Sequence, residues 1–363
     1  MNPYDFVPLP ARVLQEAPVP REKVGQHCSL IRCRVTAITP IFIAATQAAG
    51  GTHRFIRSRY AEKDLPIIPG SSLKGVIRSI AEAVTESCIG LSGTLFSRRG
   101  QIEPDYRGKV DKAFEPCKSA KKLCPACRLF GMVSNQSHFL GKVTFGEGRT
   151  APDQFKESPQ IVLKPLMPPH PDHDAFYLRN GRIAGRKFYF HQSTVKSTIQ
   201  PTEFTKTIYP LQGLGPDGKP QTIFDFEVQS QNLTDYEYSV LVFSLFLTDG
   251  MRHKLGTGKP LGLGSVSIEP LMIRPHDQSR YRGLSKRTDS AAPGGVLTGE
   301  ALKSHLEQTM RPLIERRDPC MTELRRILKY PPATGKNGEP INYQYPERTW
   351  FDTHSQTPLA ETP

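Results

Sequence analysis

The chain has 363 residues, which allows one large domain or two smaller ones. Its 48 Lys and Arg against 35 Asp and Glu leave a net charge of +13, which points first to a polyanion such as nucleic acid, although a generically basic soluble protein has the same balance. No apolar run reaches the roughly 18 residues of a membrane span and the N-terminus has no apolar signal segment, so we expect a cytoplasmic protein with reduced cysteines and no membrane contact.

The N-terminal part of the chain predicts an arm, a strand and a basic loop. Residues 1–27 are rich in proline and lack periodicity, which indicates an extended arm or a disordered tail. Apolar and polar residues then alternate within 29–44, as in a half-buried strand. The loop over 45–64 contains a Gly-Gly pair and the basic run His53, Arg54, Arg57 and Arg59.

The stretch LPIIPGSSLKGVIRSI, residues 65–80, predicts a helix with an anion site at its start. Apolar residues at helical spacing place the helix over about 72–85. A helix N-terminus presents unpaired N–H groups and about half a positive charge, which suits a phosphate. Lys74 and Arg78 stand one turn apart beside the apolar stripe. The alternative is that one of the two serines before Leu73 only caps an ordinary helix.

The middle of the chain predicts two strands around a poorly patterned segment. The segments 141–148 and 222–230 alternate as strands do. Between them, 150–220 is irregular and rich in proline, around one strand-like run at 186–193. An irregular segment of that length is typical of an insertion or a functional loop.

The remainder of the chain predicts helices and one further strand. Residues 234–237 have the spacing of a capping box and precede a mostly apolar helix, which we expect to be buried. Residues 254–270 read as a glycine-rich loop running into a strand. The tail, 275–363, carries two candidate helices at about 298–316 and 320–329.

Taken in order, these elements predict an α+β fold. The outline of strand, helix, strand, strand, helix and strand fits a four-stranded sheet backed by two helices, which is the ferredoxin-like βαββαβ plan. The same plan is the scaffold of RNA-recognition (RRM) domains.

Three cysteines in the run EPCKSAKKLCPACRLFG predict a structural zinc site. Cys124 and Cys127 form a CxxC knuckle, which directs two thiolates at one metal, and Cys117 supplies a third. We favour Cys88 over His138 as the fourth ligand, because sulfur ligands dominate structural sites. Zinc would let this segment fold although it has few apolar residues. The alternatives are a set of buried reduced cysteines and a redox CxxC pair.

The run HKLGTGKPLGLGS is a glycine-rich loop beside two lysines. Its glycines and lysines are Gly256, Gly258, Gly262, Gly264, Lys254 and Lys259. It is not a P-loop, because Pro260 stands where Ser or Thr is needed, and it is not the dinucleotide fingerprint, because it precedes a strand. The N–H groups of such a loop suit phosphate. The alternative is a glycine-rich hairpin without a ligand.

Four motifs, in this order, resemble the RAMP superfamily of CRISPR proteins. They are LPIIPGSSLKGVIRSIAEAV, CPACRLFG, GKVTFGEG and HKLGTGKPLGLGSVSI. The chain looks most like the repeated backbone subunit, the Cas-seven group, of type III effector complexes. The spacing CKSAKKLCPAC is similar to the zinc knuckle of the type III-D and III-E branches, and type VII systems resemble type III-D in turn. The resemblance covers roughly residues 28–270.

The resemblance implies an architecture and a set of partners. Identical subunits would form a filament along a guide RNA (crRNA), to which a complementary target RNA pairs, in a complex with other CRISPR subunits. The subunit would have a ferredoxin-like palm over 28–274, with the zinc insertion at about 88–130 and a thumb-like insertion within 150–220. An N-terminal arm (1–27) and a C-terminal extension (275–363) would flank the palm.

The resemblance also implies which residues contact RNA. The guide backbone would be contacted by Ser71, Ser72, Lys74 and Arg78. The segment from Gly256 to Gly264 would form the glycine-rich loop near the RNA path. The basic run from His53 to Arg59 lies in the loop that faces the target.

Cleavage of the target is the point at which this chain departs from the pattern. Many type III backbone subunits cleave with metal ions, using an aspartate in the loop after the first strand. Here that position falls near Arg54 or Phe55, and the acids of the loop are Glu62 and Asp64, at its far end. We therefore expect a binding subunit that leaves cutting to a separate nuclease.

Three alternatives to a purely binding subunit stay open. Asp64 would serve a Mg²⁺-dependent endoribonuclease that cuts target RNA. His53 with Arg54 would instead process a precursor guide without metal. A more distant alternative is a stand-alone zinc-containing RNA-binding protein.

Overall fold

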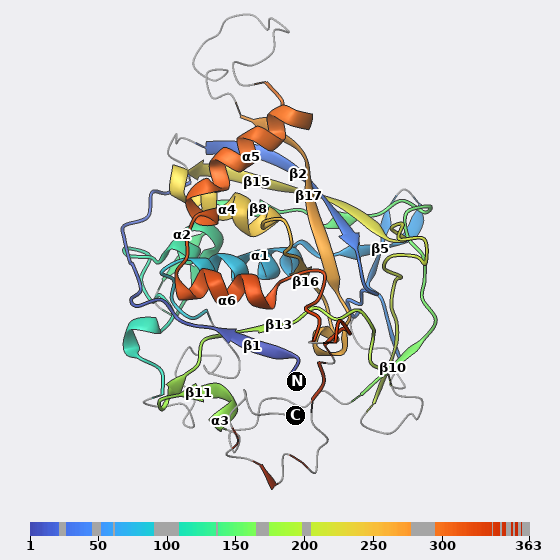
Figure 1. Ribbon diagram of the computed structural model, residues 1–363. Coiled ribbons are helices and arrows are strands. Elements are labelled where there is room, and N and C mark those ends of the chain that lie inside the picture. Colours follow the sequence, from blue (N-terminus) through green and yellow to red (C-terminus); the bar gives the residue numbers. More distant parts are fainter. Residues whose placement is uncertain are drawn as a thin grey trace, which may run out of the picture.

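The computed structural model describes residues 1–21, 27–45, 52–60, 62–90, 109–135, 137–164, 174–197, 205–276, 295–335, 337–341, 343–345, 350, 353, 354 and 357. Long strands form a twisted sheet in the upper half of Figure 1, and helices α1 (Gly70–Val84) and α6 (Pro319–Ile327) lie below them. Among the described residues, no helix is both long enough and apolar enough to cross a membrane.

The centre of the fold is an antiparallel sheet with three strands of 11 residues. These strands are β2 (His27–Ala37), β15 (Ile223–Leu233) and β17 (Ser265–Pro275). β2 lies between the other two and is antiparallel to both. Its alternating sequence buries Ile31 and Val35 and exposes Arg32, as the pattern predicts for a half-buried strand.

Shorter strands extend this sheet. They are β4 (Arg57–Tyr60), β5 (Lys63–Ile68), β8 (Val143–Phe145), β9 (Gly148–Arg149) and β16 (His253–Lys254). The strand order is β16-β17-β2-β15-β9-β5-β4, and β8 also pairs with β15. The strand predicted at 141–148 is thus two short strands, β8 and β9, which both pair with β15; between them the Gly146 N–H donates to the Glu227 carbonyl at 2.8 Å.

Four longer helices pack with the sheet. Besides α1 and α6 they are α4 (Asp235–Phe246) and α5 (Gly299–Ile314). α4 packs against α1 and α5, and α6 packs against α1. The predicted capping box of α4 is confirmed, because Thr234 accepts from the Glu237 N–H at 3.2 Å and Glu237 accepts from the Thr234 N–H at 3.1 Å.

The predicted α+β class is confirmed by the order of these elements. Along the chain, β2, α1, β8, β15, α4 and β17 alternate as strand, helix, strand, strand, helix and strand. In the sheet their strands lie in the order β17-β2-β15-β8, and each neighbouring pair is antiparallel.

The N-terminal arm is extended but fixed, so the alternative of a disordered tail is wrong for its first residues. β1 (Tyr4–Val7) pairs antiparallel with β13 (Arg186–Tyr189). Three of the four residues of β1 are buried. Farther along the arm, the Leu14 N–H donates to the Glu86 carbonyl at 2.9 Å. A four-residue strand is too short to produce a periodic signal in the sequence.

The two helices predicted in the C-terminal tail are confirmed as α5 and α6. Leu302 and Leu306 of α5 and Met321 and Leu324 of α6 are buried in the same hydrophobic core as α1 and α4. This part of the tail therefore belongs to the main body of the fold.

The irregular segment 150–220 contains short elements. They are β10 (Ile161–Leu163), α3 (Asp174–Tyr177), β11 (Leu178–Arg179), β12 (Arg182–Ile183), β13 and β14 (Lys206–Tyr209). β14 joins β10 and β3 (Thr52–Arg54) in a three-stranded sheet. Residues 165–173 and 198–204 lie outside the described part of the chain, so the expected thumb stays a prediction.

Candidate metal centre and nucleic-acid interface

Four buried cysteines converge on one point beside α1. Cys88 follows the end of α1, Cys117 follows the short 3-10 helix Lys112–Phe114, and Cys124 and Cys127 belong to α2 (Pro125–Phe130) and its N-cap. Their sulfur atoms all lie within 4.8 Å of one another. The Cys88 sulfur is 3.8 Å from those of Cys117 and Cys127 and 3.5 Å from that of Cys124.

The cluster fits a tetrahedral zinc. Zn–S bonds of about 2.3 Å place the sulfurs of a tetrahedral four-cysteine site about 3.8 Å apart, which matches the distances around Cys88. Cys88 is thus the fourth member that the sequence favoured, whereas His138 is exposed and outside the cluster. A closed set of four thiolates would hold zinc in a structural role and leave no open position for catalysis.

Local sequence explains how the CxxC pair is presented. Cys124 is the N-cap of α2 and Pro125 stands in its first turn, so one turn of helix brings Cys127 back to the same side. The chain then leaves α2 through Gly131, at φ 88°, into the hairpin of β6 (Gly131–Val133) and β7 (His138–Leu140). A Cβ on Gly141 would lie 2.5 Å from the Phe130 carbonyl, so glycine permits this close crossing.

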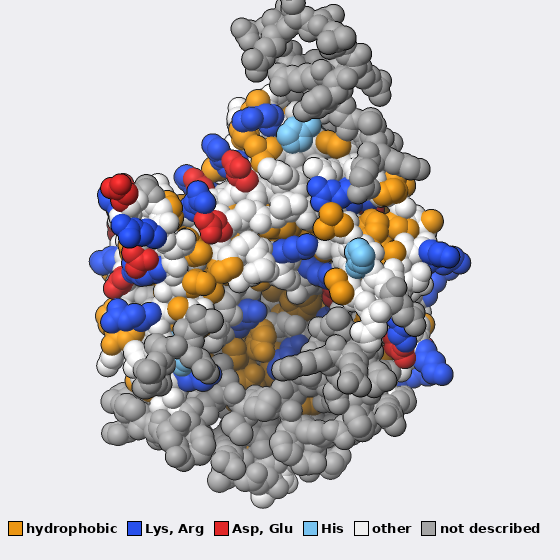
Figure 2. Space-filling model, turned by 180° about the vertical axis from the view of Figure 1, so that it is seen from behind, with side chains coloured by type: hydrophobic (Ala, Val, Ile, Leu, Met, Phe, Trp, Pro, Cys, Tyr) orange, Lys and Arg blue, Asp and Glu red, His pale blue; other side chains and the backbone are white. Residues whose placement is uncertain are grey.

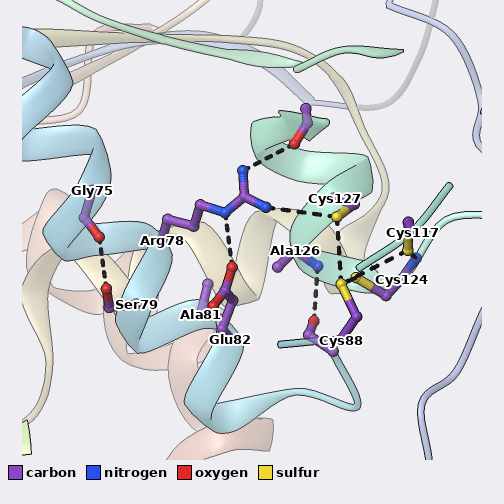
Figure 3. A network of polar contacts seen from close by, with 12 residues as sticks. Gly75, Arg78, Ser79, Ala81, Glu82, Cys88, Cys117, Cys124, Ala126 and Cys127 are labelled. Atoms are coloured by element: carbon purple, nitrogen blue, oxygen red, sulfur yellow. Dashed lines mark hydrogen bonds and ion pairs between the residues drawn. The ribbon is translucent and has the colours of Figure 1, made fainter. Parts of the chain in front are cut away.

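Arg78 joins helix α1 to this cluster, as Figure 3 shows. Its guanidinium pairs with Glu82 at 2.8 Å, donates to the Gly131 carbonyl at 3.0 Å and approaches the Cys127 sulfur at 3.6 Å. Burial alone would lower the pKa of Arg78, but the charge of Glu82 and its hydrogen bond raise the pKa above its ordinary value. Donors to ligand sulfurs and compensating charge are what a negative zinc–thiolate centre needs around it.

A second arginine closes the network around Cys88. Arg186 of β13 pairs with the other Glu82 oxygen at 3.0 Å. Its second terminal nitrogen donates to the carbonyls of Ser87 and Cys88, both at 2.8 Å. Glu82 is 11% exposed and lies between two arginines. It therefore connects α1 to β13 and to the four cysteines, which we call the metal cluster. The i, i+4 spacing of Arg78 and Glu82 could have indicated their pair, but the sequence analysis assigned Arg78 to the guide, and no pattern indicates Arg186.

The N-terminus of α1 has no side-chain cap. The helix begins at Gly70, two residues earlier than predicted, and its N-cap Pro69 provides no side-chain hydrogen bond. The two serines therefore lie inside the first turn, and the capping alternative is wrong. A Cβ on Gly70 would lie 2.3 Å from the Phe145 carbonyl, so glycine lets the helix start against β8. Ser71 is exposed, and the N–H groups of Gly70 and Ser71 have no acceptor among the described residues.

Lys74 is the cation nearest to that N-terminus along the helix. It is half-buried, and burial together with the charge of Arg78 lowers the pKa of its ammonium group. No acidic partner for Lys74 occurs within the described part of the chain. Of the two cations predicted on α1, Arg78 is thus engaged with the metal cluster, and Lys74 is available to a ligand.

In the basic loop after β2, some residues contact other side chains of the chain and others are exposed. Arg57 pairs with Glu157 and donates to the Asp64 carbonyl at 3.0 Å. Arg54 lies over the ring of Tyr209, 5.3 Å from its centre. Arg59 is exposed, and His53 is half-buried in β3. The two exposed arginines of this run, at 54 and 59, remain the candidates for contact with RNA.

The candidate catalytic positions do not belong to a metal-ligand group among the described residues. Phe55, near which the family aspartate would fall, is 4% exposed and packs against Phe224. Asp64 stands opposite Arg59 in the β4–β5 hairpin. Neither Asp64 nor His53 belongs to any group of three metal-ligating side chains among the described residues. Residues 46–51 and 61 of the loop lie outside the described part, and their sequence contains no acid.

The glycine-rich loop is packed against the protein's own backbone. Gly256 has φ 87°, and a Cβ there would lie 2.3 Å from the Phe42 carbonyl. Gly264 has φ 75° and donates its N–H to the Pro40 carbonyl at 2.8 Å. The other two glycines of the run, Gly258 and Gly262, have φ 76° and 98°. These positions need glycine for conformation and close packing, which favours the hairpin alternative of the sequence analysis.

Of the two lysines of that loop, one is buried and the other is half-buried. Lys254 is buried and its ammonium group donates to the Leu263 carbonyl at 3.1 Å. Burial and the charge of Lys259 lower the pKa of Lys254 to about 7. Burial also lowers the pKa of Lys259, which lies in the 3-10 helix Lys259–Leu261. The expected RNA contact through this loop stays a prediction.

Residues 34–267 match the RAMP superfamily, over well more than half of the chain. The chain belongs to the RAMP superfamily. No curated protein sequence matches it. Among solved structures, it is similar to Csc2 of Thermofilum pendens, with 16% identity over 85% of this chain and 88% of that chain and a TM-score of 0.37. It is also similar to a chain of a type IV-B CRISPR complex, with 14% identity over 71% and 95% and a TM-score of 0.36. The family predicted from the four motifs is confirmed, whereas the subtype stays a prediction.

Proposed function

We propose that this RAMP protein is a guide-RNA-binding backbone subunit of a type III-like or type VII CRISPR effector complex. Copies of it would repeat along the guide and present the guide to a complementary target RNA. Family membership and the net charge of +13 support the proposal. Lys and Arg side chains are spread over the face that Figure 2 shows, and a hollow near its centre has basic and hydrophobic side chains at its floor.

The contrast between the N-termini of α1 and α4 carries this proposal. α4 has a complete capping box and two acids in its first turn, so its N–H groups and partial positive charge are satisfied within the chain. α1 has no side-chain cap and no acid in its first turn, and Lys74 follows one turn later. The N-terminus of α4 is thus capped within the chain, whereas that of α1 is not. The uncapped helix α1 is the one whose sequence carries the family motif.

The sheet supports a phosphate-contacting palm. We propose that β17, β2, β15 and β8 with α1 and α4 form the ferredoxin-like palm. Arg32 pairs with Glu227 at 2.9 Å and Arg34 with Asp225 at 2.8 Å, across β2 and β15. This face therefore carries paired charges where an RRM domain carries the aromatic rings that stack on bases. RNA recognition through the start of α1 fits such a palm better than stacking on the sheet.

We propose that the subunit binds RNA without cutting it, and that a separate nuclease supplies cleavage. Support comes from the buried position of Phe55 and from the basic surroundings of Asp64, which lies opposite Arg59. A site that holds Mg²⁺ for RNA cleavage usually draws on more than one oxygen ligand from the protein.

Two measurements on the assembled complex test this function. Guide RNAs of increasing length should bind increasing numbers of copies, and Lys74→Gln should weaken binding while Lys303→Gln, an exposed lysine of α5, should not. Adding complementary RNA with Mg²⁺ to a complex of this subunit and its guide, without the separate nuclease, should leave the target intact. Cuts at regular spacing that disappear in Asp64→Ala would establish the endoribonuclease instead, and binding of a single copy at every length would overturn the backbone role.

A further inference from the structure

A basic surface is formed by residues that lie between and after the cysteines of the metal cluster. From Pro116 to Gly146 the sequence has five Lys or Arg residues and no Asp or Glu. Two of the five are buried: Lys142 pairs with Glu237 at 2.7 Å, and Arg128 pairs with Glu16. The other three, Lys118, Lys121 and Lys122, are exposed on the loop between Cys117 and Cys124. We call these three lysines, with the exposed face of the β6–β7 hairpin, the knuckle surface.

The lysine loop is held in one conformation at several points. Both of its ends are cysteines of the metal cluster. Its Ala120 N–H donates to the Ser137 hydroxyl at 3.0 Å, and its Lys118 carbonyl accepts from the Ser134 hydroxyl at 2.8 Å. Lys118 pairs with Glu115 at 2.6 Å, an ion pair of a kind that contributes little at a surface. No acidic partner of Lys121 or Lys122 occurs within the described ranges. A ligand would therefore meet positions that are already ordered.

The hairpin adds an apolar face beside these charges. In the register of β6 and β7, Val133 lies opposite His138 and Gly131 opposite Leu140, so these side chains share one face. Val133 is 74% exposed and Leu140 is 64% exposed, and His138 is exposed between them. Met132 is buried on the other face. An imidazole flanked by aliphatic groups can stack on an unpaired base and cover its edges.

The knuckle surface is directly connected to the start of the proposed guide site. Arg78 of α1 donates to the carbonyl of Gly131, the first residue of the hairpin, at 3.0 Å. Lys74 stands one turn before Arg78 on the same helix. Arg78 thus links the helix that carries Lys74 to the hairpin of the knuckle surface.

We infer that the knuckle surface binds single-stranded RNA, as a second contact beyond the N-terminus of α1. The inference rests on the proposed function. Lys121 and Lys122 contact phosphates and His138 stacks on an unpaired base. RNA is the partner that the charge favours, because this stretch offers an anion three exposed ammonium groups, of which only that of Lys118 is paired with a carboxylate among the described residues.

A binding experiment with the full, zinc-loaded chain tests this surface. The probe is a fluorescein-labelled oligouridylate, which lacks structure of its own, and anisotropy is followed from low to high NaCl. A plot of log affinity against log salt has a negative slope, and Lys121→Gln/Lys122→Gln should reduce the magnitude of that slope by about 1.4. The reason is that each phosphate contact to a single strand contributes about 0.7. At about 0.15 M salt this equals about a tenfold loss. The matched pair Lys303→Gln/Lys329→Gln, two exposed lysines outside the knuckle surface, should leave the slope unchanged.

Further readouts separate this inference from its competitors. Zinc content should stay the same in Lys121→Gln/Lys122→Gln; joint loss of zinc and affinity would mean that the lysines only compensate the thiolate charge. If the lysine variant keeps its RNA affinity and Val133→Ser/Leu140→Ser changes the sedimentation of the protein, the knuckle surface is a contact between proteins. If Lys74→Gln weakens binding and the lysine pair does not, the inference fails and the proposed function stands. If neither changes binding, the proposed function fails.

Discussion

Replacing Arg78 by Met removes the connection between α1 and the metal cluster at a single point. The change deletes the pair with Glu82, the bond to the Gly131 carbonyl and the contact with the Cys127 sulfur. Breaking a buried ion pair costs about 3–5 kcal/mol when the partner is left alone. Arg78 is 27% exposed and Glu82 keeps its pair with Arg186, so we expect the free energy of unfolding to fall by about 2–3 kcal/mol.

The same change should weaken zinc binding about 10–100-fold, as the loss of a group that supports a metal ligand usually does. Urea unfolding with excess zinc measures the first effect, and zinc transfer to a coloured chelator measures the second. Ser79→Ala is the matched control, because its exposed hydroxyl bonds only to the Gly75 carbonyl one turn back. Unchanged zinc affinity together with weakened guide binding would refute the reasoning and restore Arg78 as the guide contact that the sequence indicated.

Three further predictions address the metal, the start of α1 and the buried lysine. Cys88→Ser should lose zinc in elemental analysis while His138→Ala keeps it; the reverse result would contradict the assignment of four cysteine ligands. Gly70→Ala should destabilise the fold by about 1–3 kcal/mol in urea unfolding, because its Cβ meets backbone, whereas Gly75→Ala, with open space around its Cβ, should stabilise it by about 0.5–1 kcal/mol. The pKa of Lys254 is lowered to about 7, so the unfolded chain binds more protons between about pH 7 and 10 and stability should rise with pH there. Lys254→Met should flatten that rise in the same assay, and an unaltered slope would show that Lys254 is not its cause.

The parts of the molecule that could be predicted from the sequence are those encoded by local pattern. The helical spacing after Pro69 placed α1 to within two residues, and the Thr234–Glu237 spacing predicted a capping box that the structure has. The metal cluster could also be predicted, because a CxxC turn directs two thiolates at one metal. Cys88 was predicted as the fourth ligand because sulfur ligands dominate structural zinc sites, and no sequence spacing indicated it.

The parts that could not be predicted depend on contacts between distant segments. Arg78 reads as a free cation on a helix face, and its partner carbonyl at Gly131 is more than 50 residues away. The glycines of the 256–264 loop suit either a phosphate or a packed backbone, and the choice depends on the segment around Phe42. β1 was missed because four residues carry no periodic signal and its partner strand is far along the chain.

The pairing of β1 with β13 has a consequence for how the protein is made and handled. Residue 7 pairs with residue 186, and α6, which is translated later still, packs on the same strand. β1 must therefore wait without its partner strand until β13 and α6 have been synthesised. The loop closed by this pairing is long, which makes it a late and slow event in folding. A bulky fusion partner placed directly before β1 would hinder this pairing. The same partner attached at the other end of the chain should therefore give a higher yield of folded protein.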